Sequence, residues 1–365
     1  MTEANDTRHM ARALQLAAYG LYTTDPNPRV GCVLVKDGTV IGEGWHARAG
    51  EPHAEVLALR AAGEAACGAT AYVSLEPCAH HSRTPPCAEA LIAAGVSRVV
   101  TAMEDPNPQV IGQGLQMLRE AGIATESGLL QSQAEALNPG FIKRMCTGRP
   151  FVRCKLAMSL DGRTAMALGE SQWITGAAAR ADVHRLRARS SAMLTGIGTV
   201  LTDDPSLNAR LDTDEPVQQP LRVVLDSQLR MPTDARMLSL PGRTLVCCTE
   251  ATDVEKIVTL TDAGAEVHCL PVENGHVSLV VLLDFLAGEG VNEVTVEAGA
   301  ILNGALLQAR LVDEVIVYLA PLLMGDAAHG LFHLPGLEKM AQRIELKIVD
   351  MRAVGDDWRI TARLF

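Results

Sequence analysis

The chain has few aromatic residues and an excess of acidic side chains, and both features limit the partners that it can bind. Only 3% of its 365 residues are aromatic, and the formal net charge is −11. Proteins that bind nucleic acids stack bases on aromatic side chains and contact phosphates through a basic surface. The composition therefore argues against nucleic-acid binding, although a local basic cluster could still bind one small phosphorylated substrate.

Long apolar segments are also missing. No stretch approaches about 20 uninterrupted apolar residues, the length that a membrane-spanning helix needs. The longest candidate, residues 277–288, is interrupted by Asp284 and is typical of a buried helix. The first ten residues are polar, so no signal peptide is expected. Nine cysteines without regular spacing indicate reduced thiols. We therefore expect a cytoplasmic protein with no membrane partner.

Among the residues that are present, a histidine, a glutamate and two cysteines have the order found in zinc deaminases. His53 and Glu55 form a His-x-Glu motif, Cys78 follows a proline, and Cys87 lies downstream. Imidazole and thiolate are common zinc ligands, and three protein ligands leave one position open for water, as at catalytic zinc sites. Glu55 is then placed to transfer protons as the general acid–base. This order of residue types is the signature of zinc-dependent deaminases.

Two alternatives to this metal site remain open. The cysteines of the signature are usually separated by two residues, whereas eight residues separate Cys78 from Cys87, so both could be ordinary core thiols. His80 and His81 are rival ligands, although a site that uses Glu55 as its base needs only three. We favour the three-ligand site because both halves of the motif lie at predicted ends of helices or strands.

The first half of the chain alternates between predicted helices and strands. A helix is expected from about residue 7 to residue 22, and a hairpin over residues 30–46 with its turn at 36–38. Further helices are predicted at 53–63, 85–95 and 114–122, and further strands at 70–78, 97–105 and from residue 123. This order predicts a sheet that is covered by helices on both faces.

The second half is predicted to be another α/β unit. Residues 138–150 contain two prolines, two glycines and a basic cluster, and are predicted to link domains 1–146 and 151–365. No Gly-x-Gly-x-x-Gly follows a strand, so the usual dinucleotide fingerprint is absent. A glycine-containing turn is instead predicted at 195–199. Residues 297–304 follow a strand and open a helix at Gly299, whose backbone N–H groups could bind a pyrophosphate.

Motifs in both halves resemble one known family. They are PNPRVG (26–31), HAE (53–55), LEPCAHHSRTPPC (75–87), AMEDPNPQVIGQG (102–114), KLAMSLDGRTA (155–165), TGIGTVLTDDPSLNAR (195–210) and VEAGAILNGALL (296–307). The chain resembles the bifunctional deaminase–reductases of riboflavin biosynthesis, the RibD family. The resemblance implies a cytidine-deaminase-like αβα domain followed by a dihydrofolate-reductase-like α/β domain. We also expect a homo-oligomer, with a dimer favoured.

That resemblance implies two successive reactions on one small molecule. The first domain would use zinc to deaminate a diaminopyrimidine that carries a phosphoribosylamino group, giving the corresponding uracil. The second domain would use NADPH to reduce the ribosyl side chain to ribityl. Opening of the ribosyl ring exposes an electrophilic carbon that can accept hydride from the cofactor, while the protein orients the two partners.

The resemblance also implies residues for each site. Contacts with the pyrimidine substrate are expected at Asn27, His46, His80, Arg83, Asp105 and Asn107, although Asn27, Asp105 and Asn107 equally suit turns beside prolines. NADPH is expected along Ala157, Trp173, Thr199, Asp203, Ser227, Gly299, Ala300, Ile301, Leu302, Asn303, Gly304 and Ala305. The substrate of the reductase is expected along Lys155, Ser171, Arg187, Leu207, Arg210 and Glu297.

Three of these roles have a chemical basis. Arg187 and Arg210 suit a 5′-phosphate, although Arg187 lies in an arginine-rich helix where solvation alone could explain it. Lys155 could assist ring opening or deliver a proton. Ser227 and Arg230 suit the 2′-phosphate of NADPH, so we expect NADPH to be preferred to NADH.

Two other functions compete with this interpretation. One is a zinc deaminase of free nucleosides whose second half is a regulatory nucleotide-binding domain, and the glycine and arginine motifs in that half speak against it. The other is a non-catalytic fold with a structural zinc. A structural site would need a fourth cysteine or histidine ligand and would have no use for Glu55.

Overall fold

Two separate sheets organise the chain in a computed structural model that describes residues 3–79, 86–108, 110–212, 217–250 and 253–364. One sheet belongs to the unit Met1–Arg149 and the other to the unit Pro150–Phe365. Both units combine strands with helices, which confirms the predicted α/β class. Within the described ranges no helix is long and apolar enough to cross a membrane.

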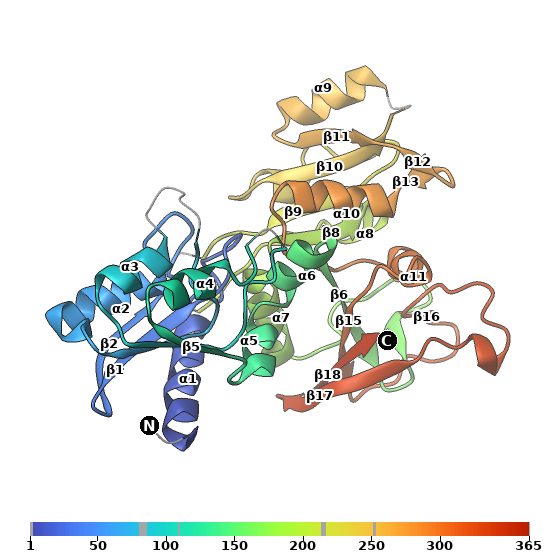
Figure 1. The fold of residues 1–365 in the computed structure, drawn as a ribbon. Helices are drawn as coiled ribbons and strands as arrows, with labels where there is room; N and C mark the ends of the chain where they lie inside the picture. Colours follow the sequence, from blue (N-terminus) through green and yellow to red (C-terminus); the bar gives the residue numbers. More distant parts are fainter. Residues whose placement is uncertain (1–2, 80–85, 109, 213–216, 251–252, 365) are drawn as a thin grey trace. The chain divides into compact units, whose positions relative to one another are not determined.

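The first unit is a five-stranded sheet with the strand order β2-β1-β3-β4-β5 (Figure 1). β1 pairs antiparallel with β2 and β3, while β3, β4 and β5 are parallel. Its elements, in chain order, are α1 (Glu3–Ala18), β1 (Gly31–Lys36), β2 (Thr39–Trp45), α2 (Ala54–Ala62), a 3-10 turn (Gly63–Ala66), β3 (Thr70–Val73), α3 (Cys87–Ala93), β4 (Arg98–Thr101), α4 (Gln113–Glu120), β5 (Ala124–Ser127), α5 (Gln131–Leu137) and α6 (Pro139–Thr147).

Alternating side chains on β1 give the first unit a core on each face of its sheet. Cys32 and Leu34 pack with residues of α2, α3 and α4, whereas Val33 and Val35 pack with residues of α1 and α5. Successive side chains of a strand point to opposite faces, so a run of consecutive apolar residues is suited to burial on both sides. The sheet therefore carries α2 and α3 on the same face, and these two helices begin at the predicted zinc ligands.

The second unit has a nine-stranded sheet with the order β11-β10-β9-β8-β14-β6-β15-β18-β17, and two small sheets pair β12 with β13 and β7 with β16. In this order, the first seven strands, from β11 at the edge to β15, are parallel. The last two strands, β18 and β17, continue the sheet in antiparallel pairing. Its elements are β6 (Phe151–Ser159), β7 (Arg163–Ala165), α7 (Ala177–Arg189), β8 (Ala192–Gly196), α8 (Ile197–Asp203), β9 (Leu221–Leu225), β10 (Thr244–Thr249), α9 (Val254–Asp262), β11 (Glu266–Leu270), β12 (Val272–Glu273), β13 (His276–Val277), α10 (Leu279–Gly288), β14 (Glu293–Val296), α11 (Ala300–Gln308), β15 (Glu314–Ala320), β16 (His329–Gly330), β17 (Leu346–Val354) and β18 (Asp357–Leu364), with 3-10 turns at Arg236–Leu238 and Met340–Gln342.

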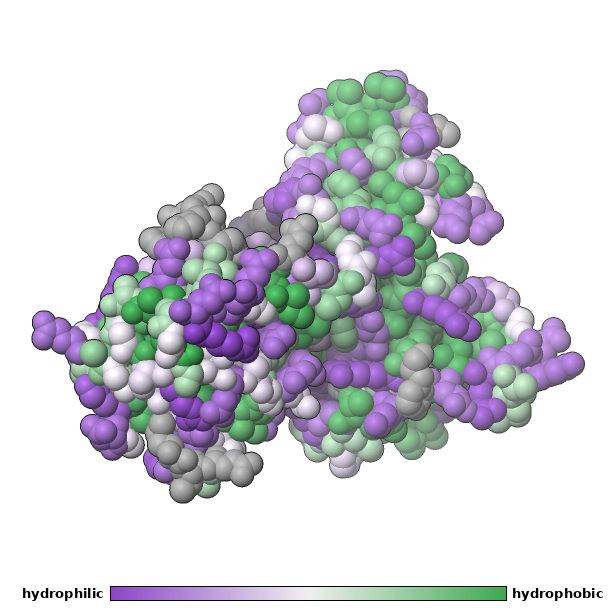
Figure 2. Space-filling model, in the orientation of Figure 1, coloured by the Kyte–Doolittle hydropathy of each residue, from purple (hydrophilic) through white to green (hydrophobic). Residues whose placement is uncertain are grey.

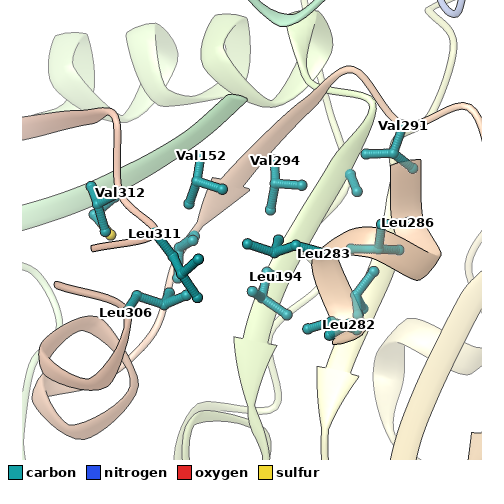
Figure 3. Packing of buried hydrophobic residues seen from close by; sticks show 14 of the residues in the cluster. Val152, Leu194, Leu282, Leu283, Leu286, Val291, Val294, Leu306, Leu311 and Val312 are labelled. Atoms are coloured by element: carbon teal, nitrogen blue, oxygen red, sulfur yellow. The ribbon is translucent and has the colours of Figure 1, made fainter. Parts of the chain in front are cut away.

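The main core of the second unit lies between its sheet and the helices α10 and α11. Figure 3 shows side chains of β6, β8 and β14 meeting these helices, with Leu283 beside Val294 and Leu194. The residue before Leu194, Met193, packs on the opposite face, with α8 and α9. Figure 2 shows apolar residues on the outer surface of α9, where Val254 and Val258 are exposed.

Several predicted boundaries are wrong, and most errors have a local cause. Residues 138–150 were expected to be a linker, but most of them form α6, with Pro139 in its first turn and Gly148 at its end. These are the usual start and stop residues of a helix. The segment 195–199 was expected to be a turn, but α8 begins at Ile197. The strand predicted at 70–78 ends at Val73, so Cys78 lies in the irregular segment after it.

Candidate active sites

The three predicted zinc ligands come together in the first unit. His53 is the N-cap residue of α2, Cys87 is the first residue of α3, and Cys78 follows β3. The Nδ1 atom of His53 lies 3.2 Å from the Sγ atom of Cys87 and 3.7 Å from that of Cys78. All three ligand atoms lie within 4.8 Å of one another. Two sulfur atoms and one imidazole nitrogen at this spacing fit a tetrahedral zinc that keeps one position open.

The local backbone holds the two cysteines together. The N–H group of Cys87 donates a hydrogen bond to Cys78 Sγ over 3.3 Å, and that of Ala88 donates to the Cys78 carbonyl oxygen over 3.2 Å. Hydrogen bonds from the Cys87 thiol, from His53 and from the Cys87 backbone N–H group lower the pKa of Cys78. The hydrogen bond from the Cys87 thiol, together with burial, raises the pKa of Cys87. These hydrogen bonds favour the thiolate form of Cys78, which is the form of cysteine that binds metal.

Glu55 lies in the first turn of α2, close to both cysteines, and only 3% of its surface is exposed. Burial, and to a smaller extent the neighbouring Cys78 thiolate, raises the pKa of Glu55 to about 7. A carboxyl group with a pKa near neutrality can both accept and return a proton, as a general acid–base must.

Two predicted substrate residues adjoin the ligand cluster. The ring of His46 packs edge-on against that of His53, with 5.2 Å between the ring centres. Its Nδ1 atom lies 3.3 Å from the Pro52 carbonyl oxygen, which accepts only if this nitrogen carries the proton. Its Nε2 atom is then the acceptor for the Asn27 amide at 3.0 Å. Burial lowers the pKa of His46, so the neutral ring is favoured.

The other predicted pyrimidine contacts lie on a loop or outside the described residues. The side chain of Asp105 accepts a hydrogen bond from the Asn107 N–H group over 2.8 Å. The backbone N–H group of Asp105 donates to the carboxylate of Glu76, a buried residue that the sequence did not single out. Glu76 belongs to the same sequence motif as Cys78, and this position was the only feature of the sequence that could have indicated a functional role for it. His80 and Arg83, and the rival ligand His81, fall outside the described residues.

In the second unit, two of the predicted substrate residues, Lys155 and Arg187, form a charged cluster around a third, Glu297. Arg187 makes two hydrogen bonds to the Glu297 carboxylate, at 2.7 and 2.8 Å, and the Lys155 ammonium lies 3.9 Å from it. Although burial opposes the shift, Arg187 and Lys155 lower the pKa of Glu297 to about 2. Burial lowers the pKa of Lys155, which makes its ammonium a better proton donor.

Arg210 lies at the edge of this cluster. Its backbone N–H group donates to His184 Nδ1 over 3.3 Å, and its exposed guanidinium lies 3.2 Å from His184 Nε2. Burial, and then the charges of Arg187 and Arg210, lower the pKa of His184 to about 4, so the ring is neutral at pH 7. Ser171 lies in the segment that precedes α7, whereas Leu207 is buried and packs with Met193 and α8.

The predicted NADPH residues are spread over several elements. Ala157 lies on β6, Thr199 and Asp203 on α8, Ser227 after β9, and residues 299–305 at the start of α11. Gly299 is the N-cap of α11, and a Cβ there would find open space. The first backbone N–H groups of a helix lack intrahelical acceptors, which suits them to a pyrophosphate.

Three of these residues have surroundings that limit what they could contact. Trp173 is largely exposed and lies under the Arg180 guanidinium, 4.7 Å from the ring centre. Asn303 is fully buried and donates to the Ala298 carbonyl oxygen. Gly304 packs so tightly that a Cβ would lie 2.0 Å from the His333 carbonyl oxygen. The buried hydrogen bond of Asn303 and the tight packing at Gly304 therefore stabilise the position of α11.

Family profiles match both units. The family described as "Cytidine and deoxycytidylate deaminase zinc-binding region" matches residues 3–103. The family described as "RibD C-terminal domain" matches residues 150–360. The two matches define a zinc deaminase joined to a reductase, and they do not favour the alternative in which the second half is only regulatory.

Similarity to individual proteins extends over nearly the whole chain. The chain is 55% identical over 362 residues to the riboflavin biosynthesis protein RibD of Escherichia coli K12, covering 96% of this chain and 97% of that protein. It is 50% identical to RibD of Haemophilus influenzae, covering 98% and 97%. A solved structure of Acinetobacter baumannii RibD has a TM-score of 0.92 at 48% identity, covering 99% of both chains. The chain belongs to the RibD family, the bifunctional deaminase–reductases of riboflavin biosynthesis.

Proposed function

We propose that His53, Cys78 and Cys87 hold the zinc ion of the deaminase and that Glu55 moves the protons of its reaction. The observation that carries this proposal is the convergence of the three donor atoms beside a buried carboxyl group. Zinc bound there would supply the Lewis acidity that activates water. Glu55 takes one proton from the attacking water and delivers it to the pyrimidine ring nitrogen, and then carries the second proton from the added hydroxyl group to the departing amino group, which leaves as ammonia.

The residues around Glu55 would orient the pyrimidine. The neutral His46 ring fixes the Asn27 amide through a 3.0 Å contact, so one face of the site presents a fixed hydrogen-bonding group. Asp105 and Asn107 would contact the substrate from the loop before α4. Arg83 is expected to add a positive charge near the substrate. Fixed polar groups of this kind lower the entropic cost of reaching a reactive geometry.

For the reductase we propose a site around Lys155 and Glu297. NADPH, the cofactor of this half, would supply hydride to the carbon exposed when the ribosyl ring opens. The Lys155 ammonium would donate a proton to the ring oxygen, which its lowered pKa favours. Arg187 is held by Glu297, so the exposed Arg210 is the better candidate for the 5′-phosphate. The start of α11 would bind the cofactor pyrophosphate.

One coupled assay tests both activities together. The purified chain is mixed with the diaminopyrimidine phosphoribosylamine and NADPH, and ammonia release and NADPH oxidation are followed in the same sample. We expect one ammonia for each NADPH, with ammonia release first. Ammonia release without any NADPH oxidation would contradict the reductase assignment, and the reverse would contradict the deaminase assignment.

We also propose a homo-oligomer, with a dimer favoured, that acts in the cytoplasm without nucleic acid or membrane. Exposed apolar side chains on the edge strand β17, such as Ile348 and Met351, support an association between chains. None of the nine cysteines, all of which lie in the described ranges, forms a disulfide, as expected in a reducing compartment. Light scattering coupled to gel filtration tests the oligomer, and a mass of about one chain, 38.9 kDa, would contradict it.

A further inference from the structure

A buried carboxylate with no assigned role lies two residues before Cys78. Only 5% of the surface of Glu76 is exposed. Its Oε2 atom accepts hydrogen bonds from the backbone N–H groups of Asp105 and Gly112, both at 2.9 Å. Its Oε1 atom accepts from the N–H groups of Gly114 at 2.9 Å and Leu115 at 3.2 Å. One side chain therefore satisfies four backbone donors from a distant part of the chain.

These contacts make Glu76 the N-terminal cap of α4. The helix begins at Gln113, and its own N-cap residue, Gly112, has no side chain that could accept a hydrogen bond. Gly114 and Leu115 lie in the first turn, where backbone N–H groups lack intrahelical acceptors and the helix dipole favours a negative charge. A carboxylate from another segment thus takes the role that a serine or aspartate usually has at the N-cap.

The same contacts connect the substrate loop to the zinc-ligand segment. Glu76 holds Asp105 by its backbone, and Asp105 in turn accepts a hydrogen bond from the N–H group of Asn107. At the other end of the loop, a Cβ on Gly114 would lie 1.9 Å from the Pro77 carbonyl oxygen. The start of α4 is therefore packed directly against the residue that precedes Cys78.

We propose that Glu76 is a positioning residue of the deaminase, whose carboxylate fixes the loop of Asp105 and Asn107 relative to Cys78. This inference rests on the proposed function, because it takes Asp105 and Asn107 to contact the pyrimidine. A glutamine at this position keeps the shape but presents one acceptor oxygen, and its NH₂ group faces two backbone N–H donors. Half of the cap is then lost, and the loop is no longer fixed.

Steady-state kinetics of Glu76→Gln in the full chain test the proposal. We expect KM for the diaminopyrimidine to rise about tenfold, because two of the four hydrogen bonds that fix the loop are lost, while kcat falls by less. Zinc content should stay at the parent level, and NADPH oxidation with the deaminated pyrimidine should be unchanged. Glu64→Gln is the matched control, because Glu64 is an exposed glutamate of the same unit.

Three results would overturn the proposal: a KM equal to that of Glu64→Gln, a fall in kcat with KM unchanged, or loss of zinc together with activity. The last result would make Glu76 a support of the metal ligands alone. A parent chain that releases no ammonia would instead overturn the proposed function, so the two failures are distinguishable.

Hydrogen exchange on the parent chain provides a test that does not require the variant to fold. The amide protons of Asp105, Gly112, Gly114 and Leu115 should be protected, although Asp105 and Gly112 lie outside regular secondary structure. Exchange of the Asp105 and Gly112 amides as fast as in an exposed loop would contradict the proposal. In a folded Glu76→Gln variant, these amides should lose protection while those of α2 keep theirs.

Discussion

The charge of Glu297 illustrates how single residues of this enzyme depend on their partners. Burial alone would raise the pKa of this carboxyl group, but Arg187 and Lys155 lower it to about 2. A carboxylate whose pKa is lowered in the folded state stabilises that state above its usual pKa of 4.5. This stabilisation is lost as the pH falls from about 4.5 towards 2, because the unfolded state binds the proton first.

Replacing Glu297 should reveal this dependence. We expect Glu297→Gln to lower the unfolding free energy of the second unit by about 3 kcal/mol at pH 7, because a buried arginine loses its partner. The difference from the parent should shrink as the pH falls from 4.5 to 2. Urea unfolding in a Trp45→Phe background measures this, because the remaining Trp173 and Trp358 both belong to the second unit.

The matched control for that experiment is the exposed pair of Arg243 and Glu266. Its two hydrogen bonds, both 2.7 Å long, resemble those of the buried pair, but both side chains are about half exposed. Glu266→Gln should cost about 1 kcal/mol or less. If Glu297→Gln and Glu266→Gln lowered the unfolding free energy equally, burial of Glu297 would contribute nothing to stability.

A second single-residue substitution, Cys87→Ser, tests the proposed metal ligands. A serine hydroxyl is close in size to a thiol but is a poor zinc ligand, so bound zinc should fall from about one per chain to near zero. Ammonia release should disappear with it. Elemental analysis of purified protein measures the zinc, and Cys67→Ser, which replaces an exposed cysteine of the same unit, should leave it intact. Full zinc in Cys87→Ser would remove Cys87 from the ligand set.

The sequence predicted the functional residues that belong to a recognisable local motif. It missed residues whose role depends on contacts with residues far away in the sequence. The His-x-Glu and Pro-Cys motifs named His53, Glu55 and Cys78 because their side chains do recognisable chemistry. Glu76 was missed because its partners are backbone N–H groups more than 25 residues away, which have no sequence signature. For the same reason, the pairing of Arg187 with Glu297 could not be predicted.

At the scale of elements, buried strands and amphipathic helices were the predictable parts. The segment that became β1 was recognised because its apolar residues follow one another, and α10 because most of its residues are apolar. Segments whose neighbours decide their structure were not. α8 begins within a glycine-containing stretch that also suits a turn, and β17 was missed because its side chains are almost all exposed at the sheet edge.

The end of β9 provides a prediction at the scale of an element. Arg230 lies just after this strand, where the buried Asp226 accepts hydrogen bonds from the N–H groups of Arg230 and Met231. The half-exposed Arg230 guanidinium remains 4.0 Å from Asp226 and is available to a ligand. We expect Arg230→Ala to raise KM for NADPH about tenfold or more with little change for NADH, because a 2′-phosphate loses a charged partner.

The control for this prediction lies at the opposite end of the neighbouring strand. Arg243 precedes β10 and is similarly exposed, so Arg243→Ala should change neither KM. Initial rates of NADPH and NADH oxidation with the deaminated pyrimidine provide the measurement. Equal weakening of both cofactors by Arg230→Ala would exclude Arg230 from binding the 2′-phosphate.

At the scale of the whole molecule, the chain carries two chemistries on two units. Each unit has its own sheet and its own hydrophobic cores, and every residue proposed for one reaction lies within one unit. In the function proposed above, zinc and Glu55 have no part in hydride transfer, and α11 has none in water activation. The two activities should therefore be separable by a single substitution, although they act on the same molecule in succession.

NADPH oxidation by Glu55→Gln, measured with each pyrimidine in turn, tests this claim most directly. An amide cannot transfer the protons of deamination, so the variant should keep its zinc and lose at least about a hundredfold of its ammonia release. It should oxidise NADPH at the parent rate with the deaminated pyrimidine and fail to do so with the diamino compound. Parental NADPH oxidation with the diamino compound would contradict the order of the reactions, and none with the deaminated compound would contradict the separation of the sites.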